Sequence, residues 1–321
     1  MDPVLKQLAE CGQPWVEYNT RINLLKETGN KAEVKSIHNS LVHHSSVVSL
    51  TEELKQWPGT VLNSHKSAHQ CYHKLAFLAD IGIQQDDPGM AEIIQQIKKH
   101  VSEEGLYQLP MNIPQHYGGS GTDVWAWALC DAPTILYALV KFGLKNELNL
   151  EKPISFLASV CQSNGWPCTV SKELGSFHGP GKKSDPCPYA TLLMLKLLAL
   201  DEKWSQSREA ENGIESLLTL WADSREKHPY MFYMGTDFRK LKVPLIWYDI
   251  VHAAYVLSQY PTCRQDKRFQ KMVSVIVNKT DSNGLFVPES EWKAWKEWDF
   301  GQKKKPSMWL TYIIKCIMVY R

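Results

Sequence analysis

An excess of charge of one sign is missing from this 321-residue chain: 36 Lys and Arg stand against 34 Asp and Glu, which leaves a formal net charge of +2. No long basic block is present either, and such blocks are what bind a phosphate backbone. Nucleic acid is therefore not expected as a partner. With 44% hydrophobic and 22% charged residues, the chain also lacks the composition of a disordered protein, and it is long enough to bury a large core.

Long apolar runs and a secretory leader are absent as well. The most apolar segment, Thr191 to Leu200, is ten residues long and contains Lys196, so it suits a buried helix better than a membrane span. The first residues do not contain a basic stretch followed by an apolar run. None of the eight cysteines lies in a Cys-x-x-Cys pair, and we expect them to be reduced. These features predict a cytoplasmic chain with no transmembrane segment.

Aromatic residues, by contrast, are abundant, with 12 Trp and 13 Tyr. Large rings are costly to leave exposed, and they line apolar cavities well. The composition therefore favours a protein built around a cavity.

A repeat of just under sixty residues organises the sequence. Gly105, Gly165 and Gly284 each follow a helix-like stretch and precede a large apolar residue, and they are 60 and 119 positions apart. We predict each glycine as the left-handed C-cap of an amphipathic helix. A second, more apolar helix follows each of them at nearly the same period.

These second helices are apolar nearly all round, which marks helices that are buried on every side. They begin near residues 129–134, 185–191, 247–252 and 307–311. Amphipathic and fully apolar helices that alternate at a fixed period predict two concentric layers. Because the apolar layer must be enclosed, we favour a closed ring over an open stack of helix pairs.

The region before this repeat adds further helices. Residues 51–57 and 65–78 are predicted as one more outer and inner pair, and residues 1–50 as two helices broken around Gly29 and Asn30. The chain is thus expected to be all-α, with about ten to twelve helices and no strand. Residues 1–50 are predicted as a helical extension packed on the ring, and residues 51–321 as the ring itself.

The segment from Lys152 to Trp166 resembles the Gln-Trp repeat of the terpenoid cyclases, with Phe156-Leu157, Gln162 and Gly165-Trp166 at the matching places. The pattern of residues 50–321 resembles the α/α toroid that squalene and hopene cyclases share with protein prenyltransferase β subunits. This resemblance implies a central apolar cavity and an isoprenoid-like substrate. Fold alone does not confer function, so the chemistry has to come from particular residues.

In a toroid the inner helices begin at one mouth of the cavity, so residues at their starts come together. These residues offer thiol, carboxylate and imidazole donors, and three such ligands with one open position form a catalytic zinc site. The set is Cys130, Asp131, Asp185, Cys187, Asp249 and His252.

Asp185-x-Cys187 followed by His252 resembles the zinc site of protein farnesyl- and geranylgeranyltransferase β subunits. The resemblance implies that Asp185, Cys187 and His252 bind zinc. Structural roles suit the same residues: a helix N-cap, a small buried side chain and a hydrogen-bonded core histidine.

The same resemblance gives roles to neighbouring residues. Lys182 and Lys183, just upstream, would bind a prenyl diphosphate, and Asp249, one turn before His252, would hold a ligand in place. The β subunits work with a separate α subunit, and no such protein partner can be inferred from this chain.

Two carboxylates suit a second, cyclase-like activity. Terpenoid cyclases protonate an alkene or epoxide with an Asp-x-Asp-Asp motif, and this sequence contains none. Asp131 or Asp249 would supply the acid if burial raised its pKa. Both are therefore catalytic candidates.

Three histidines form a separate candidate cluster. His65, His69 and His73 are spaced i, i+4 and i+8, so a helix would place them on one face, where two can bind one metal ion. No glutamate of the His-Glu-x-x-His kind accompanies them, and ordinary hydrogen-bonded histidines are the alternative.

Aromatic residues at the same end of the cavity are candidates for binding the isoprenoid, by packing or by stabilising a carbocation. They are Trp125, Trp127, Tyr189, Trp247, Tyr248 and Trp309. Trp292, Trp295 and Trp298 follow helical spacing among charged residues, which predicts an amphipathic helix that covers the ring.

The leading hypothesis is a zinc-dependent transferase that moves a prenyl or alkyl group and binds an isoprenoid-like substrate. Two alternatives remain: a cyclase-like enzyme without the usual acid motif, and a non-catalytic toroid that binds a hydrophobic ligand or a partner protein.

Overall fold

The computed structural model describes residues 2–179, 181–182, 184–224, 226 and 233–319. The α-helices of these residues are α1 (Pro3–Ala9), α2 (Pro14–Asn19), α3 (Ala32–Val42), α4 (Ser45–Leu54), α5 (Cys71–Ile81), α6 (Met90–Ile97), α7 (Ala132–Lys141), α8 (Glu151–Ser159), α9 (Pro188–Leu198), α10 (Glu202–Ser205), α11 (Arg208–Ala222), α12 (Ile250–Ser258), α13 (Lys267–Val277) and α14 (Met308–Val319). Within the described ranges, none of these helices has the length and apolar character needed to cross a bilayer.

Five apolar helices form an inner layer. α5, α7, α9, α12 and α14 contact one another in this order, and every residue of α9 is buried. Pro133 and Pro188 lie in the first turns of α7 and α9, where a missing N–H breaks no helical hydrogen bond. The all-round apolar composition of these helices is explained by this position, because each one has neighbours on every side.

The N-terminal helices close the inner layer into a ring. α2 contacts both α5 and α14, and a π-helical turn over Thr20–Leu24 contacts α14. The Asn19 side-chain nitrogen donates to the Ile81 carbonyl of α5 at 2.8 Å, and the Asn23 side chain donates to the Tyr312 hydroxyl of α14 at 2.9 Å. Segments of the first fifty residues therefore contact both α5 and α14, and the predicted boundary at residue 50 falls inside α4.

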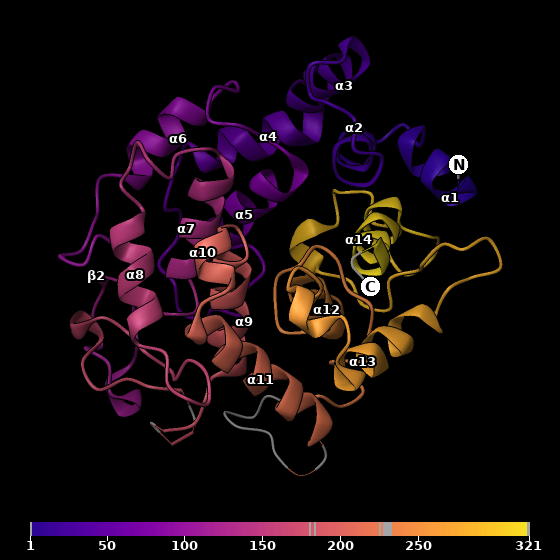
Figure 1. Ribbon diagram of the computed structural model, residues 1–321. Helices are drawn as coiled ribbons and strands as arrows, with labels where there is room; N and C mark the ends of the chain where they lie inside the picture. Colours follow the sequence, from indigo (N-terminus) through magenta and orange to yellow (C-terminus); the bar gives the residue numbers. More distant parts are fainter. Residues whose placement is uncertain (1, 180, 183, 225, 227–232, 320–321) are drawn as a thin grey trace.

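The amphipathic helices form the outer layer. α3 packs on α2, α4 on α5, α8 on α7, α11 on α9 and α13 on α12, and Figure 1 shows these helices around the central ones. In α13 the buried residues are Phe269, Met272, Val273 and Ile276, which is the spacing of one helix face. The all-α toroid with two concentric layers that the repeat predicts is thus confirmed by the packing of its helices.

The three repeat glycines lie in the same turn. Gly105, Gly165 and Gly284 have φ values between +79° and +104°, and the N–H of each donates to the carbonyl three residues earlier. The left-handed conformation is as predicted, but each glycine follows the end of its helix by six to eight residues and is not a C-cap. At Gly165 a Cβ would lie 2.9 Å from the Ser216 hydroxyl, so the turn leaves no room for a side chain.

A short hairpin departs from the expectation of no strand. β1 (Leu109–Met111) and β2 (Val124–Ala126) pair antiparallel, and three-residue strands are too short to give an alternating pattern. Leu62 exchanges backbone hydrogen bonds with Pro110 and Asn112, at 2.8 and 3.2 Å. The hairpin therefore fixes the position of Leu62, and two turns, at residues 65–66 and 68–69, lead from there into α5.

The turns before α5 change the placement of the histidines. α5 begins at Cys71, so His65 and His69 precede the helix and only His73 belongs to it. The predicted common helix face of His65, His69 and His73 is wrong, because tertiary backbone contacts override the local pattern.

The tryptophan-rich segment is a loop with a 3-10 turn over Lys293–Trp295, so the helix predicted there is wrong. Trp295 and Trp298 are buried against Phe77 of α5, with ring centroids 5.0 and 4.8 Å away. The Trp295 ring nitrogen also donates to the Ala68 carbonyl at 2.8 Å. Contacts with Phe77 and Ala68, and not a helical conformation of the segment, therefore position the Trp295 and Trp298 rings.

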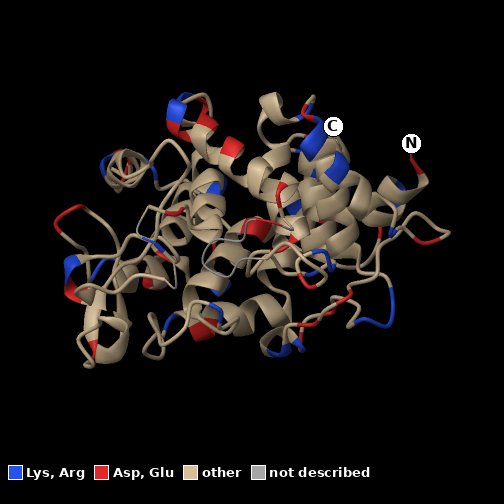
Figure 2. Ribbon diagram, turned by 90° about the horizontal axis from the view of Figure 1, so that it is seen from below, with Lys and Arg blue, Asp and Glu red and all other residues tan. Residues whose placement is uncertain are grey.

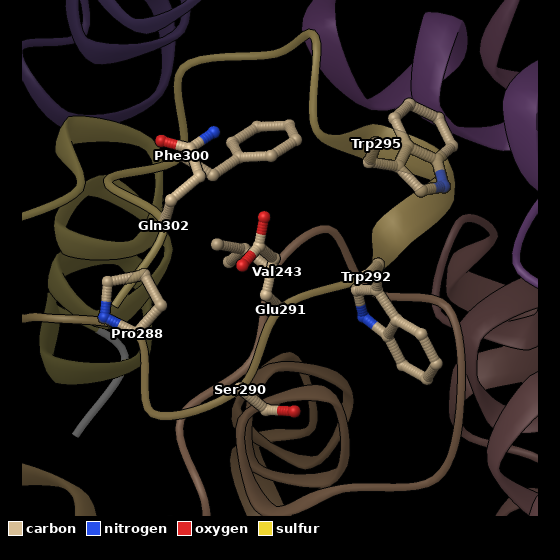
Figure 3. A pocket seen from close by; sticks show the side chains of 8 residues that line it. All are labelled: Val243, Pro288, Ser290, Glu291, Trp292, Trp295, Phe300 and Gln302. Atoms are coloured by element: carbon tan, nitrogen blue, oxygen red, sulfur yellow. The ribbon is translucent and has the colours of Figure 1, made fainter. Parts of the chain in front are cut away.

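Figure 3 shows a small hollow beside this segment, between Val243, Trp292, Trp295 and Phe300. Its volume is about 10 Å³, which holds roughly one water molecule.

Lys and Arg are interspersed with Asp and Glu in the view of Figure 2.

Candidate functional site

A cavity of about 840 Å³ opens at one end of the inner ring. The segments that lead into the inner helices build its wall: residues 63–66 before α5, 128–130 before α7, Cys187 and Ala190 at the start of α9, and 247–248 before α12. Residues 112–114, 168–170 and 177–179 line it from the loops. The starts of the inner helices therefore do converge on one cavity.

Aromatic rings supply much of the apolar wall, and two of the predicted ones are among them. Trp247 and Tyr248 line the cavity together with Phe177 and Phe238. The Trp247 ring lies against the Tyr189 ring, with centroids 4.0 Å apart and the ring planes tilted by 36°. The sequence analysis missed the two phenylalanines, because they lie in loops without a periodic pattern. The cavity-lining Lys66 places its ammonium 5.7 Å from the centre of the Trp247 ring.

The other predicted aromatic residues have structural contacts outside the cavity wall. Tyr189 is fully buried and donates its hydroxyl to the Ile246 carbonyl at 2.9 Å. Trp309 stacks on Tyr312, and Trp127 packs edge-on against Phe156. Trp125 stacks on His100 at 3.3 Å.

Asp131 lies at the N-terminus of α7 and is completely buried. One carboxylate oxygen accepts a hydrogen bond from His65 Nε2 at 2.8 Å, and both oxygens lie within 3.3 Å of the Ala128 N–H. Burial raises the pKa of Asp131, while the His65 contact opposes that rise. Since His65 lines the cavity, the pair links a buried carboxylate to the cavity surface.

Asp249 occupies the equivalent place at the start of α12. Its Oδ1 accepts hydrogen bonds from the Val251 and His252 N–H groups, both at 3.0 Å, so it caps the helix. Its Oδ2 has no hydrogen-bond partner among the described residues, and burial raises the pKa of Asp249 to about 7. Asp249 itself is not part of the cavity wall.

Two thiols lie side by side in the cavity wall. Cys130 precedes Asp131 and Cys187 is the N-cap residue of α9, and both line the cavity. Interaction with the Cys130 thiol lowers the pKa of Cys187, whereas interaction with Cys187 and burial raise the pKa of Cys130. The sulfur of a third lining residue, Cys168, accepts from the Gly179 N–H at 3.1 Å.

The predicted zinc ligands have separate contacts. Asp185 accepts from the Lys182 N–H at 3.1 Å, Cys187 faces the cavity, and His252 is buried with Nδ1 at 3.0 Å from the Trp247 carbonyl. Nowhere in the described part of the chain are three or more His, Cys, Asp or Glu residues placed to hold a metal ion.

These three side chains do not fit one zinc site in this arrangement, and zinc binding stays a prediction. Burial lowers the pKa of His252 to about 3, so its ring is neutral. Of the two predicted diphosphate-binding lysines, Lys183 lies outside the described residues and Lys182 is exposed on the loop before α9. His65 and His178 both line the cavity, and the partner of His65 could not be predicted from spacing because 66 residues separate it from Asp131.

Fold and cavity together define an α/α toroid with an aromatic-lined chamber at one end. No family model matches the sequence, and no curated protein matches it. Among solved structures, the chain is similar to a variant of the type II terpene cyclase MstE from Scytonema, in complex with the product merosterolic acid A. The identity is 10%, the TM-score is 0.42, and the superposition covers 99% of this chain and 98% of the other. The toroid assignment rests on the helices described above, and the argument about function rests on the cavity.

Proposed function

We propose that the protein binds an isoprenoid-like apolar molecule in the cavity and acts on it by acid catalysis, with His65 as the group that donates the proton. The observation that carries the proposal is the His65–Asp131 pair, in which a fully buried carboxylate holds an imidazole at the surface of an apolar cavity. This is the cyclase-like alternative of the sequence analysis.

The cavity supports an apolar ligand by its size and its wall. A volume of about 840 Å³ lies within the range of about 300–1,000 Å³ that is usual for small-molecule sites. Aromatic faces from three separate segments of the chain, at Phe177, Phe238 and Trp247, line it. Their faces also favour positive charge that develops on a bound molecule.

The hydrogen bond to Asp131 decides which atom of His65 exchanges a proton. Because Nε2 is engaged with the carboxylate at 2.8 Å, Nδ1 is the ring atom left for the ligand. Proton transfer from Nδ1 to an epoxide oxygen breaks a C–O bond, a neighbouring alkene captures the carbon, and loss of a proton completes an isomerisation.

Binding is tested with farnesol, whose apolar chain fits the proposal, by quenching of tryptophan fluorescence. We expect Trp247→Ala to weaken binding by about tenfold, which corresponds to about 1.4 kcal/mol. Trp292→Ala, on the loop beside the small hollow, is the matched control and should bind like the wild type. Absence of saturable binding to the wild type would refute the proposal.

Catalysis is tested by incubating the protein with the terminal epoxide of farnesol and searching for a product of unchanged mass. His65→Gln should abolish that product, while His69→Gln, at an exposed histidine outside the cavity, should leave its rate unchanged. Asp131→Asn should slow the reaction by about 10²–10⁴-fold, because Asp131 holds the His65 ring in place. A His65→Gln variant that is as active as the wild type would rule His65 out as the acid.

A further inference from the structure

The wall of the 840 Å³ cavity changes from apolar to polar towards its opening. Ala128, Leu129 and Ala190 line the cavity and are buried, so they form its inner part. The lining residues that are exposed to solvent include Asn63, Ser64, Lys66, His178 and Asp237. A molecule with an apolar body and a polar head group therefore matches this wall, with the head group at the opening.

The two charged residues at this opening differ in their partners. Among the described lining residues, Lys66 is the only Lys or Arg and Asp237 the only Asp or Glu. Asp237 accepts hydrogen bonds from Lys240 Nζ at 3.1 Å and from Lys242 Nζ at 2.8 Å, so its negative charge is compensated twice. Lys66 forms no ion pair with any carboxylate of the described residues. Its ammonium is therefore the charge that remains for a ligand.

The Lys66 ammonium lies over an aromatic part of the wall. Its Nζ is 5.7 Å from the centre of the Trp247 ring, and its backbone N–H donates to the Ser64 hydroxyl at 3.3 Å. The preceding residue is fixed as well, because the His65 carbonyl accepts a hydrogen bond from the buried Tyr72 hydroxyl at 3.1 Å. The positive charge is thus held beside a ring on which an apolar chain can pack.

We propose that the cavity ligand is an apolar carboxylic acid, whose carboxylate binds Lys66 at the opening while its chain lies inside. This inference rests on the binding part of the proposed function and does not require proton transfer from His65. One ammonium compensates one negative charge, and it acts as a single point charge with three donors. A diphosphate carries several charges and would need more cations than this wall provides among the described residues.

A cationic head group is the alternative that an aromatic wall suggests, because ring faces attract positive charge. Here the face of Trp247 already has the Lys66 ammonium over it, and Asp237 is paired with two lysines. A second cation at the opening would be repelled by Lys66. The charges at the opening therefore favour an anion over a cation.

The test compares three probes that share one isoprenoid chain: farnesoic acid, farnesol and farnesylamine. Quenching of tryptophan fluorescence measures their binding to the full-length protein at about pH 7.5, where a carboxylic acid is ionised and an amine protonated. We expect the wild type to bind farnesoate about fivefold more tightly than farnesol, which is the size of one exposed ion pair, and farnesylamine more weakly than farnesol. High salt should reduce the preference for farnesoate, because it screens an exposed pair.

Variants of Lys66 assign the preference to its charge. Lys66→Met keeps an unbranched side chain without the charge and should bind farnesoate and farnesol equally, whereas Lys66→Arg should keep the preference. Lys172→Met is the matched control, because Lys172 is an exposed lysine outside the cavity that pairs with Glu103. It should bind all three probes like the wild type, and far-UV circular dichroism checks the fold of each variant.

A preference for farnesoate that is lost in Lys66→Met and kept in Lys66→Arg supports the proposal. Equal binding of farnesoate and farnesol by the wild type overturns it and leaves the apolar-ligand proposal standing, and this comparison does not depend on any variant. A preference that survives in Lys66→Met, or tighter binding of farnesyl diphosphate than of farnesoate, also overturns it. Absence of saturable binding of all three probes refutes both proposals.

Discussion

The buried polar groups at the two ends of the inner ring differ in whether they have hydrogen-bond or ion-pair partners. Towards the C-terminal ends of α5, α7 and α9, the Asp80 carboxylate accepts a hydrogen bond from the Tyr137 hydroxyl at 2.5 Å and pairs with Lys196 Nζ at 3.0 Å. Lys196 also lies 4.3 Å from the centre of the Tyr137 ring. At the N-terminal ends, Cys130, Cys168 and Cys187 line an open cavity. Asp131 and Asp249 are buried behind its wall, and the second oxygen of Asp249 has no hydrogen-bond partner among the described residues.

This difference separates stability from function within one helix layer. A buried charge whose partners are complete holds helices together and leaves nothing for a ligand. Buried groups with raised pKa values beside a cavity cost stability, and such groups concentrate at functional sites. We call the end with the Asp80–Lys196 ion pair the closed end and the end with the cavity the open end. Substitutions at the closed end are expected to change the free energy of unfolding most, and substitutions at the open end to change ligand binding and pH dependence most.

The largest effect on stability is expected at the closed end, from Asp80→Ala. Lys196 is only 3% exposed, so loss of its partner leaves a buried charge uncompensated and should cost about 3–5 kcal/mol. Urea unfolding measures this cost. Glu103→Ala, which breaks the exposed Lys172–Glu103 pair, is the control and should leave the unfolding midpoint unchanged. Similar midpoints for the two variants would remove the distinction between the ends.

A pH effect of the next size is expected at the open end, from Asp249. Its pKa is raised from 3.8 to about 7, so the folded state keeps a proton that the unfolded state loses. Stability therefore falls as pH rises from about 4 to 7, by about 4 kcal/mol, and changes little from this group above pH 7. Asp249→Asn retains a capping side chain and should flatten that slope. Unfolding at a series of pH values measures it, and an unchanged slope in the variant would assign the dependence to other groups.

A smaller and more direct comparison uses two buried tyrosines. Tyr137→Phe removes a hydrogen bond to a carboxylate, which should cost about 2 kcal/mol, whereas Tyr189→Phe removes one to a backbone carbonyl and should cost about 1 kcal/mol. Thermal unfolding of both variants gives the order. A larger loss of stability for Tyr189→Phe than for Tyr137→Phe would mean that the hydrogen bond at the closed end is not the stronger of the two.

The architecture was predictable because it depends on period and composition. The spacing of Cys130, Cys187 and Trp247 by one or two repeat units predicted that helix starts would meet, and these residues do line one cavity. The apolar stretches around Leu192 and Ile313 predicted the inner layer, since no surface helix can be apolar on all faces.

Contacts between distant segments were not predictable from spacing. His65 meets Asp131 because Leu62 is bonded to the hairpin, a contact without any local signal. Trp295 and Trp298 have helical spacing, yet their hydrogen bond and ring contacts with the region around Phe77 hold them in a loop. Zinc binding stays a prediction, because Asp185, Cys187 and His252 were assigned from a resemblance and from their place at helix starts, and neither fixes side-chain contacts. In the structure, Asp185 contacts the Lys182 N–H and His252 the Trp247 carbonyl.

The smallest effect is expected for metal content, where Cys187→Ala should match the wild type. His252 keeps Nδ1 on the Trp247 carbonyl and Asp185 keeps the Lys182 N–H, so neither is directed at Cys187, and removing the thiol should release no ligand set. Elemental analysis of both proteins, purified side by side without chelator, measures the difference. One zinc per chain in the wild type and none in Cys187→Ala would mean that a metal ion compensates the buried polar groups at the cavity end. Both ends of the ring would then have paired charges, a metal site at one and the Asp80–Lys196 ion pair at the other, and the transferase hypothesis would replace acid catalysis.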